Sequence, residues 1–196
     1  WMLNQGKSIT TVGIYCRNLR SIINSAIADG IIKQKDYPFG RRKYQIPASR
    51  NIKKALNKKD ILKIIGYKPK NEIEAYSRDM WLFSYLANGM NFTDIANLKI
   101  GNIHGDFLIF NRSKTRTSTR SKPKFVKVFI LNEMRAIIDR YGKYEALYLF
   151  SILKPGMNIE QQVDKIELTI RSINRHMGKI ANSLGIEKKV KTGTAR

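Results

Sequence analysis

The stretch MWLFSYLANGMNFTDIANLKIGNIHGDFLIFNRSK, residues 80–114, decides the fold that we predict for this chain. It opens inside a helix, because apolar residues recur at helical spacing and would bury one face of that helix. These residues are Tyr76, Met80, Phe83 and Ala87. Asn88-Gly89 should end the helix, since glycine readily adopts the left-handed backbone of a helix C-terminus. The stretch therefore predicts a buried helix followed by a tight turn.

A second short helix and a hairpin follow this turn. Thr93 is the expected N-cap of the helix, and Asp94 stands in its first turn, where the helix dipole favours an acid. Residues 107–110 are then predicted to pair with residues 125–130, where apolar side chains alternate. The connection, residues 111–124, is too long for a tight turn and carries six basic residues and no acid.

The rest of the chain predicts further helices. They are expected over residues 8–30, 60–65, 133–141 and 159–184, and the last shows apolar residues at 4-3 spacing. That spacing also allows a coiled coil, although fewer than four heptads beside a domain favour an amphipathic core helix. The predicted fold class is mostly α with a small antiparallel β-sheet, an α+β fold.

Composition indicates a polyanionic partner. The chain has 37 Lys and Arg against 15 Asp and Glu, a formal net charge of +22. Neutralising phosphates releases condensed counterions, so we expect nucleic-acid binding rather than merely solvated lysines. A single cysteine excludes a disulfide framework and a Cys-based zinc site, and two histidines without matching spacing predict no metal site. The sequence has no run of about 18 apolar residues, so it predicts no membrane span.

A basic segment separates the first predicted helix from the others. Pro38, Gly40 and Pro47 rule out a continuous helix. Eight basic residues and no acid lie between Arg41 and Lys59. The segment is either a solvated linker or a strap that crosses the DNA backbone, and we favour the strap because phosphate contacts give affinity without reading sequence.

The order of these pieces resembles a known family. The residues ANGMNFTDIANLKIGNI…FLIFNRSKT resemble the first active-site box of the tyrosine recombinases, the phage-integrase family, and its lysine-bearing hairpin. The usual box is G-[LM]-R-x-x-[DE]-[IL]-x-x-L. Five positions match, namely Gly89, Met90, Asp94, Ile95 and Leu98. The family's arginine position, however, holds Asn91.

The resemblance implies a domain organisation. Residues 1–45 would be the C-terminal part of a helical core-binding domain, residues 46–56 a basic linker, and residues 57–196 a C-terminally incomplete domain like the recombinase catalytic core. The helix over residues 8–30 would be the last long helix of the core-binding domain. The segment with the second His or Trp and the nucleophilic tyrosine would follow Arg196.

The resemblance also implies a chemistry without metal, nucleotide or other cofactor. A tyrosine attacks the scissile phosphate, two arginines bind it, and a hairpin lysine protonates the leaving 5′ oxygen. Lys114 matches the lysine, although it could be one more DNA-facing cation. Arg196 matches the second arginine by position, or is simply the last arginine of the chain, and Gly193 stands where the family has histidine.

Asn91 leaves three possibilities for the first arginine position, because an amide carries no charge and cannot bind phosphate as a guanidinium does. Another basic residue supplies the charge, a divergent branch of the family works without it, or the protein is inactive. We expect activity. The principal alternative is a non-enzymatic DNA-binding protein on the recombinase fold, and a more distant one is a basic RNA- or ribosome-associated helical protein.

The resemblance and the charge pattern together predict double-stranded DNA as the partner, with further recombinase protomers assembled on it. A bacterial, nucleoid-associated protein of the cytoplasm, an integrase of a mobile genetic element, is expected. The expected DNA-contacting residues are Arg41, Arg42, Lys43, Arg50, Lys53, Lys54, Arg112, Arg116, Arg120 and Lys122.

Overall fold

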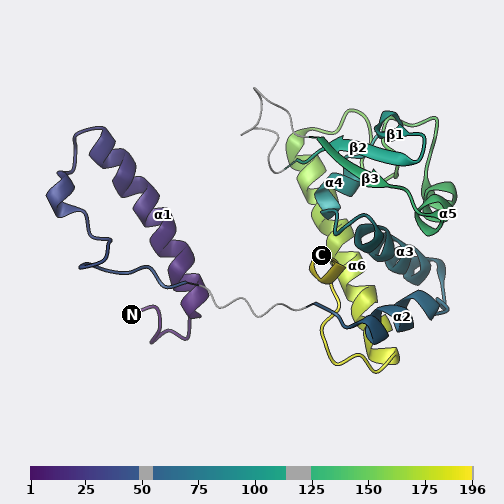
Figure 1. Cartoon of the computed structure of the whole chain (residues 1–196), viewed down its shortest axis with the longest axis horizontal. Helices are drawn as coiled ribbons and strands as arrows, with labels where there is room; N and C mark the ends of the chain where they lie inside the picture. Colours follow the sequence, from purple (N-terminus) through teal and green to yellow (C-terminus); the bar gives the residue numbers. More distant parts are fainter. Residues whose placement is uncertain (49–54, 114–124, 196) are drawn as a thin grey trace. The chain divides into compact units, whose positions relative to one another are not determined.

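The computed structural model describes residues 1–48, 55–113 and 125–195 of the chain. The chain divides into two compact units, Trp1–Lys53 (the N-terminal unit) and Lys54–Arg196 (the C-terminal unit). The described residues are mostly helical and include a small antiparallel sheet (Figure 1). The predicted fold class is therefore confirmed. No helix among the described residues is long and apolar enough to cross a membrane.

The N-terminal unit contains one long helix, α1 (Ile9–Ala28), and a short 3-10 turn, η1 (Gln34–Asp36). Ser8 caps α1, because its side chain accepts a hydrogen bond from the Thr11 N–H at 3.1 Å. The later part of the unit approaches the start of α1 closely at Gly13. A Cβ atom there would lie 2.6 Å from the Pro47 carbonyl oxygen, so the contact requires glycine.

Much of the apolar stripe of α1 is uncovered in the described part of this unit. Val12 is buried, but Tyr15, Leu19 and Ile22 are 60%, 50% and 67% exposed. The segment that ends at Pro47 reaches the beginning of the helix, near Gly13, and leaves these three side chains in solvent.

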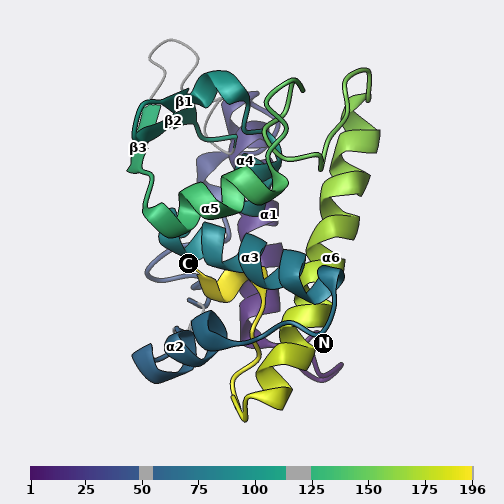
Figure 2. The same cartoon turned by 90° about the vertical axis from the view of Figure 1, so that its right-hand side faces the viewer.

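Three helices organise the C-terminal unit: α2 (Lys58–Gly66), α3 (Glu72–Leu86) and α6 (Ile159–Ser183). Asparagines cap all three, since the side chains of Asn57, Asn71 and Asn158 each accept a backbone N–H three residues on. α3 packs against α6, and α2 lies at the end of the unit away from the sheet (Figures 1 and 2). The largest side chains of the core are Trp81, Phe83, Phe150, Ile64, Met80 and Ile95.

The apolar stripe predicted for α6 is buried only from its third turn. Ile173 and Met177 are buried, whereas Ile159 and Val163 are 82% and 49% exposed. The prediction is wrong for these first turns because they extend past the point where α3 crosses α6, as both views show (Figures 1 and 2).

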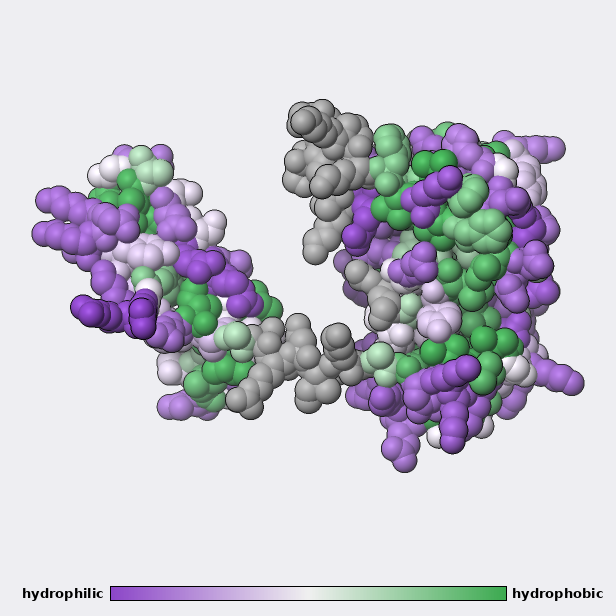
Figure 3. Space-filling model, in the orientation of Figure 1, coloured by the Kyte–Doolittle hydropathy of each residue, from purple (hydrophilic) through white to green (hydrophobic). Residues whose placement is uncertain are grey.

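The sheet has the order β1-β2-β3 and consists of β1 (Ile103–His104), β2 (Phe107–Asn111) and β3 (Phe125–Phe129). The antiparallel pairing of β2 with β3 confirms the predicted hairpin. β1 was not predicted, because two residues after the 3-10 turn η2 (Ile100–Asn102) show no alternation. One face of the sheet is buried, whereas Phe125 and Phe129 are exposed, and hydrophobic residues gather over the sheet in Figure 3.

A buried carboxylate joins α3 to α5 (Asn132–Tyr141). Asp79 is 2% exposed, and its Oδ1 accepts from the Arg78 Nη2 at 2.7 Å. Its Oδ2 accepts from the Arg140 Nη1 at 2.7 Å and from the Tyr141 hydroxyl at 3.0 Å. The Asp79 charge is thus fully paired, and it holds α5 on α3.

Candidate nucleic-acid interface

The turn after α3 brings Asn91 to the start of α4 (Phe92–Ala96). Asn88 and Gly89 both adopt a left-handed backbone, with φ of 56° and 73°. The Asn91 Oδ1 then accepts the Thr93 N–H at 3.1 Å, so Asn91 is the N-cap of α4. The predicted cap at Thr93 is therefore wrong. Asparagine caps helices better than threonine, and the left-handed turn places Asn91 where the helix begins.

Asp94 connects α4 to the hairpin. Its side chain is buried, and its Oδ1 accepts the Ser113 N–H at 2.7 Å. A carboxylate that accepts a backbone N–H makes a short and strong hydrogen bond. Ser113 directly precedes Lys114, so Asp94 fixes the backbone from which the chain continues into the basic connection.

A hollow of about 270 Å³ brings Asn91, Asp94 and Arg112 together. The turn after α3, the start of α4 and the two long strands form its walls. The other lining residues are Ala87, Asn88, Gly89, Met90, Phe110 and Val126. Arg112, which comes from the hairpin, therefore lines the same hollow as Asn91, the residue that the resemblance aligns with the family's first arginine.

The last described residues are anchored to α3 and α6. The Trp81 indole N–H donates to the Lys191 carbonyl at 2.9 Å. The Asn174 Oδ1 accepts the Thr192 N–H at 2.7 Å, at the start of η3 (Thr192–Ala195). These two bonds hold the backbone that leads to the final residue of the chain.

Gly193, which the resemblance aligns with the family's histidine, lies in η3 and is exposed. Apart from its chain neighbours and the backbone of η3, no heavy atom of the described residues lies within 4 Å of the position that its Cβ would take, and its φ is not positive. The fold therefore has room for a side chain at this position, although the sequence supplies none.

In the basic segment of the N-terminal unit, the structure describes Arg41, Arg42 and Lys43. The Lys43 Nζ donates hydrogen bonds to the carbonyl of Lys35 at 2.9 Å and to that of Tyr37, so this ammonium group closes a loop of its own unit. Arg41 and Arg42 are exposed. These two arginines have the accessibility that phosphate contacts need.

The remaining residues predicted for the site lie outside the described residues. Two of them are the candidate catalytic residues Lys114 and Arg196. The others are the predicted DNA-contacting residues Arg50, Lys53, Lys54, Arg116, Arg120 and Lys122.

The structure also shows a basic surface that the sequence analysis missed. Arg171, Arg175 and Lys179 stand four residues apart on α6, and residues 186–191 return beside the helix. The sequence analysis used only the apolar spacing of this helix. The four-residue spacing of the three cations was the signal that could have identified the basic surface.

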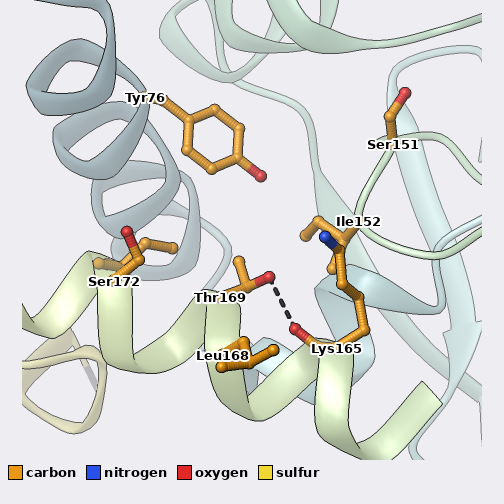
Figure 4. A pocket seen from close by; sticks show the side chains of 8 residues that line it. Tyr76, Ser151, Ile152, Lys165, Leu168, Thr169 and Ser172 are labelled. Atoms are coloured by element: carbon orange, nitrogen blue, oxygen red, sulfur yellow. Dashed lines mark hydrogen bonds between the residues drawn. The ribbon is translucent and has the colours of Figure 1, made fainter. Parts of the chain in front are cut away.

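A separate cavity of about 330 Å³ lies against α3 and α6 (Figure 4). Tyr76 and Lys165 extend toward its centre, and the Thr169 hydroxyl donates to the Lys165 carbonyl at 2.8 Å. Burial raises the pKa of Tyr76 to about 12. Lys165 is the one charged residue among the described residues that line the cavity, so this cavity lacks the cluster of cations that phosphate binding requires.

The described residues offer no metal site, since no three His, Cys, Asp or Glu side chains among them are grouped to hold an ion. His176 is buried on α6, and its Nδ1 is 2.8 Å from the Ser172 carbonyl oxygen. This histidine is therefore engaged within its own helix.

Residues 1–46 match the family model of the phage integrase SAM-like domain. The match lies within the N-terminal unit and supports membership of the phage integrase family. Comparisons with curated proteins and with solved structures find no match to the chain.

Proposed function

We propose that this chain is part of a site-specific DNA recombinase of the tyrosine type, an integrase that binds duplex DNA and, as the full-length protein, cleaves and rejoins its strands. The observation that carries the proposal is the match of residues 1–46 to the phage integrase SAM-like domain. The net charge of +22 supports DNA as the partner, because a cation excess of this size favours a polyanion.

The C-terminal unit supports the catalytic part of the proposal. Asp94 holds the backbone next to Lys114, and Arg112 lines the hollow that contains Asn91. We assign to Arg112 the phosphate-binding charge that Asn91 lacks. A guanidinium has five N–H donors, so it can donate hydrogen bonds to a group of its own chain and to a phosphate at the same time.

In the proposed reaction the tyrosine hydroxyl gives up its proton to water, and its oxygen forms a bond to phosphorus as the bond to the 5′ oxygen breaks. Lys114 gives its proton to that departing oxygen, and the arginines stabilise the charge on the non-bridging oxygens. The product is a 3′-phosphotyrosine, which the 5′ hydroxyl of a second strand then attacks in the reverse sense. Neither step consumes a metal or a nucleotide.

A non-enzymatic DNA-binding protein on the same fold is the second candidate. It is favoured by Asn91, whose side-chain oxygen caps α4 and carries no positive charge. It is also favoured by Gly193, which brings no imidazole to the chain end.

A nicked suicide duplex decides between the two candidates. The full-length protein is incubated with the duplex, denatured and separated by electrophoresis. A recombinase leaves a band of protein-linked DNA, because the cleaved end diffuses away before religation. DNA binding without such a band, on duplexes that contain the element's own ends, would support the non-enzymatic protein instead.

A further inference from the structure

The exposed side of α6 carries cations that its own helix does not balance. Arg171 pairs with Glu167 at 3.0 Å, but Arg175 and Lys179 have no acid three or four residues away in either direction. Each pair of like charges at this spacing destabilises a helix by a few tenths of a kcal/mol. This helix would be more stable with an acid at either position, so its sequence points to an anion from outside the chain.

The segment after α6 adds more cations opposite this row. Residues 186–191 run back along the helix toward the chain end (Figures 1 and 2). Together the two walls enclose a hollow of about 460 Å³, here called the α6 cleft. Its basic lining residues are Arg175, Lys179, Lys188, Lys189 and Lys191, and Glu187 is the one acid among the described residues that line it.

The second wall is held in place by contacts from several elements. Ile186 and Val190 are 4% and 1% exposed, so the segment is anchored in the core. The Lys188 Nζ donates to the Ala55 carbonyl at 2.9 Å, and the Trp81 indole binds the Lys191 carbonyl. Cations on a fixed backbone lose less freedom when they bind an anion, which favours association.

We propose that the α6 cleft binds the phosphate backbone of duplex DNA through Arg175, Lys179, Lys189 and Lys191. This inference rests on the proposed function for the identity of the polyanion. Long exposed cations line the cleft, which suits a series of phosphates better than one enclosed anion. The cleft also adjoins η3, the segment that leads to Arg196.

The test compares two triple variants of the chain. One carries Arg175→Gln, Lys179→Gln and Lys189→Gln. The control carries Lys143→Gln, Lys154→Gln and Lys165→Gln, which remove the same charge from exposed positions outside the cleft. Fluorescence anisotropy measures the affinity for a random duplex between 50 and 200 mM salt. The cleft variant should bind roughly 10²-fold more weakly at 100 mM salt, and its log–log salt slope should fall by about 2.7.

The single variant Lys189→Gln keeps the experiment decisive if the triple variant unfolds, since Lys189 lies in the exposed part of the segment and not on the helix. Its slope should fall by about 0.9. If the wild type binds steeply and the cleft and control variants change equally, the cleft proposal is wrong while the proposed function stands. If the wild type binds no duplex, both fail.

Discussion

Asn91 has a structural role at the residue position where the resemblance calls for an arginine. Its side-chain oxygen caps α4, and α4 carries Asp94, which holds the hairpin. An Asn91→Arg substitution therefore adds a cation and removes a cap at once. A gain in phosphate binding would have to exceed the loss of helix stability before any such variant could improve cleavage.

Asn91→Ala should lower the free energy of unfolding by ~1 kcal/mol, because it removes the N-cap of α4. Thr93→Ala is the matched control, since Thr93 was the cap expected from the sequence and does not serve as one. Urea denaturation followed by circular dichroism measures both. A larger loss for Thr93→Ala than for Asn91→Ala would contradict the capping role of Asn91.

Lys114→Ala should slow cleavage by the full-length protein ~10²–10⁴-fold, as expected for the loss of a general acid. DNA affinity should change little, because one phosphate contact contributes only about 0.9 to the salt slope. Arg116→Ala, in the same basic connection, is the control for charge alone. A substrate with a 5′-phosphorothiolate leaving group should restore the activity of Lys114→Ala, since a thiolate departs without a proton. Equal losses for both variants, or no rescue, would make Lys114 an ordinary DNA-contacting lysine.

At the scale of elements, the contact of α3 with α5 depends on buried polar groups. Tyr76 on α3 meets Tyr141 on α5 edge to face, with ring centroids 5.2 Å apart. Burial, and next the Asp79 carboxylate, raises the pKa of Tyr141, and burial raises the pKa of Tyr76 to about 12. Both phenols are thus held in their neutral form by the folded chain.

Tyr76→Phe should reduce the loss of stability at high pH. An unfolded tyrosine loses its proton near pH 10, whereas folded Tyr76 keeps it to about 12. The stability that neutral Tyr76 contributes to the folded state is therefore complete below pH 10 and is lost as the pH rises to about 12. Urea titrations measure the free energy of unfolding at pH 9 and at pH 11. The difference between these two values should be smaller for Tyr76→Phe than for the wild type. An unchanged difference would mean that Tyr76 does not contribute to the alkaline loss.

The sequence predicts elements with a strong pattern and misses those set by tertiary contacts. The pairing of β2 with β3 followed from the alternation of apolar residues, and the helix α6 followed from apolar residues at 4-3 spacing. β1 is too short to show a pattern, and the exposed first turns of α6 depend on where α3 crosses this helix. At the site, the spacing of the resemblance singled out Asn91 and Asp94. The hydrogen bond from the Ser113 N–H to Asp94, however, joins residues that only the fold brings together.

At the scale of the whole molecule, the charge of +22 should make DNA binding steeply dependent on salt. If the chain contacts about six to eight phosphates, its affinity for a random duplex should fall by ~10³-fold or more between 50 and 200 mM salt. Fluorescence anisotropy on a labelled duplex measures this fall. Binding that does not respond to salt would exclude the phosphate backbone as the main partner.

The two tryptophans make the two units optically distinct. Trp1 in the N-terminal unit is 89% exposed, so its emission is already that of an indole in water. Trp81 in the C-terminal unit is fully buried and stacks on Tyr85, so its emission should shift to the red when that unit unfolds. The fluorescence spectrum therefore follows the C-terminal unit, whereas circular dichroism follows the helices of both. If the units unfold independently, the two melting curves will separate, and coincident curves would show one cooperative transition.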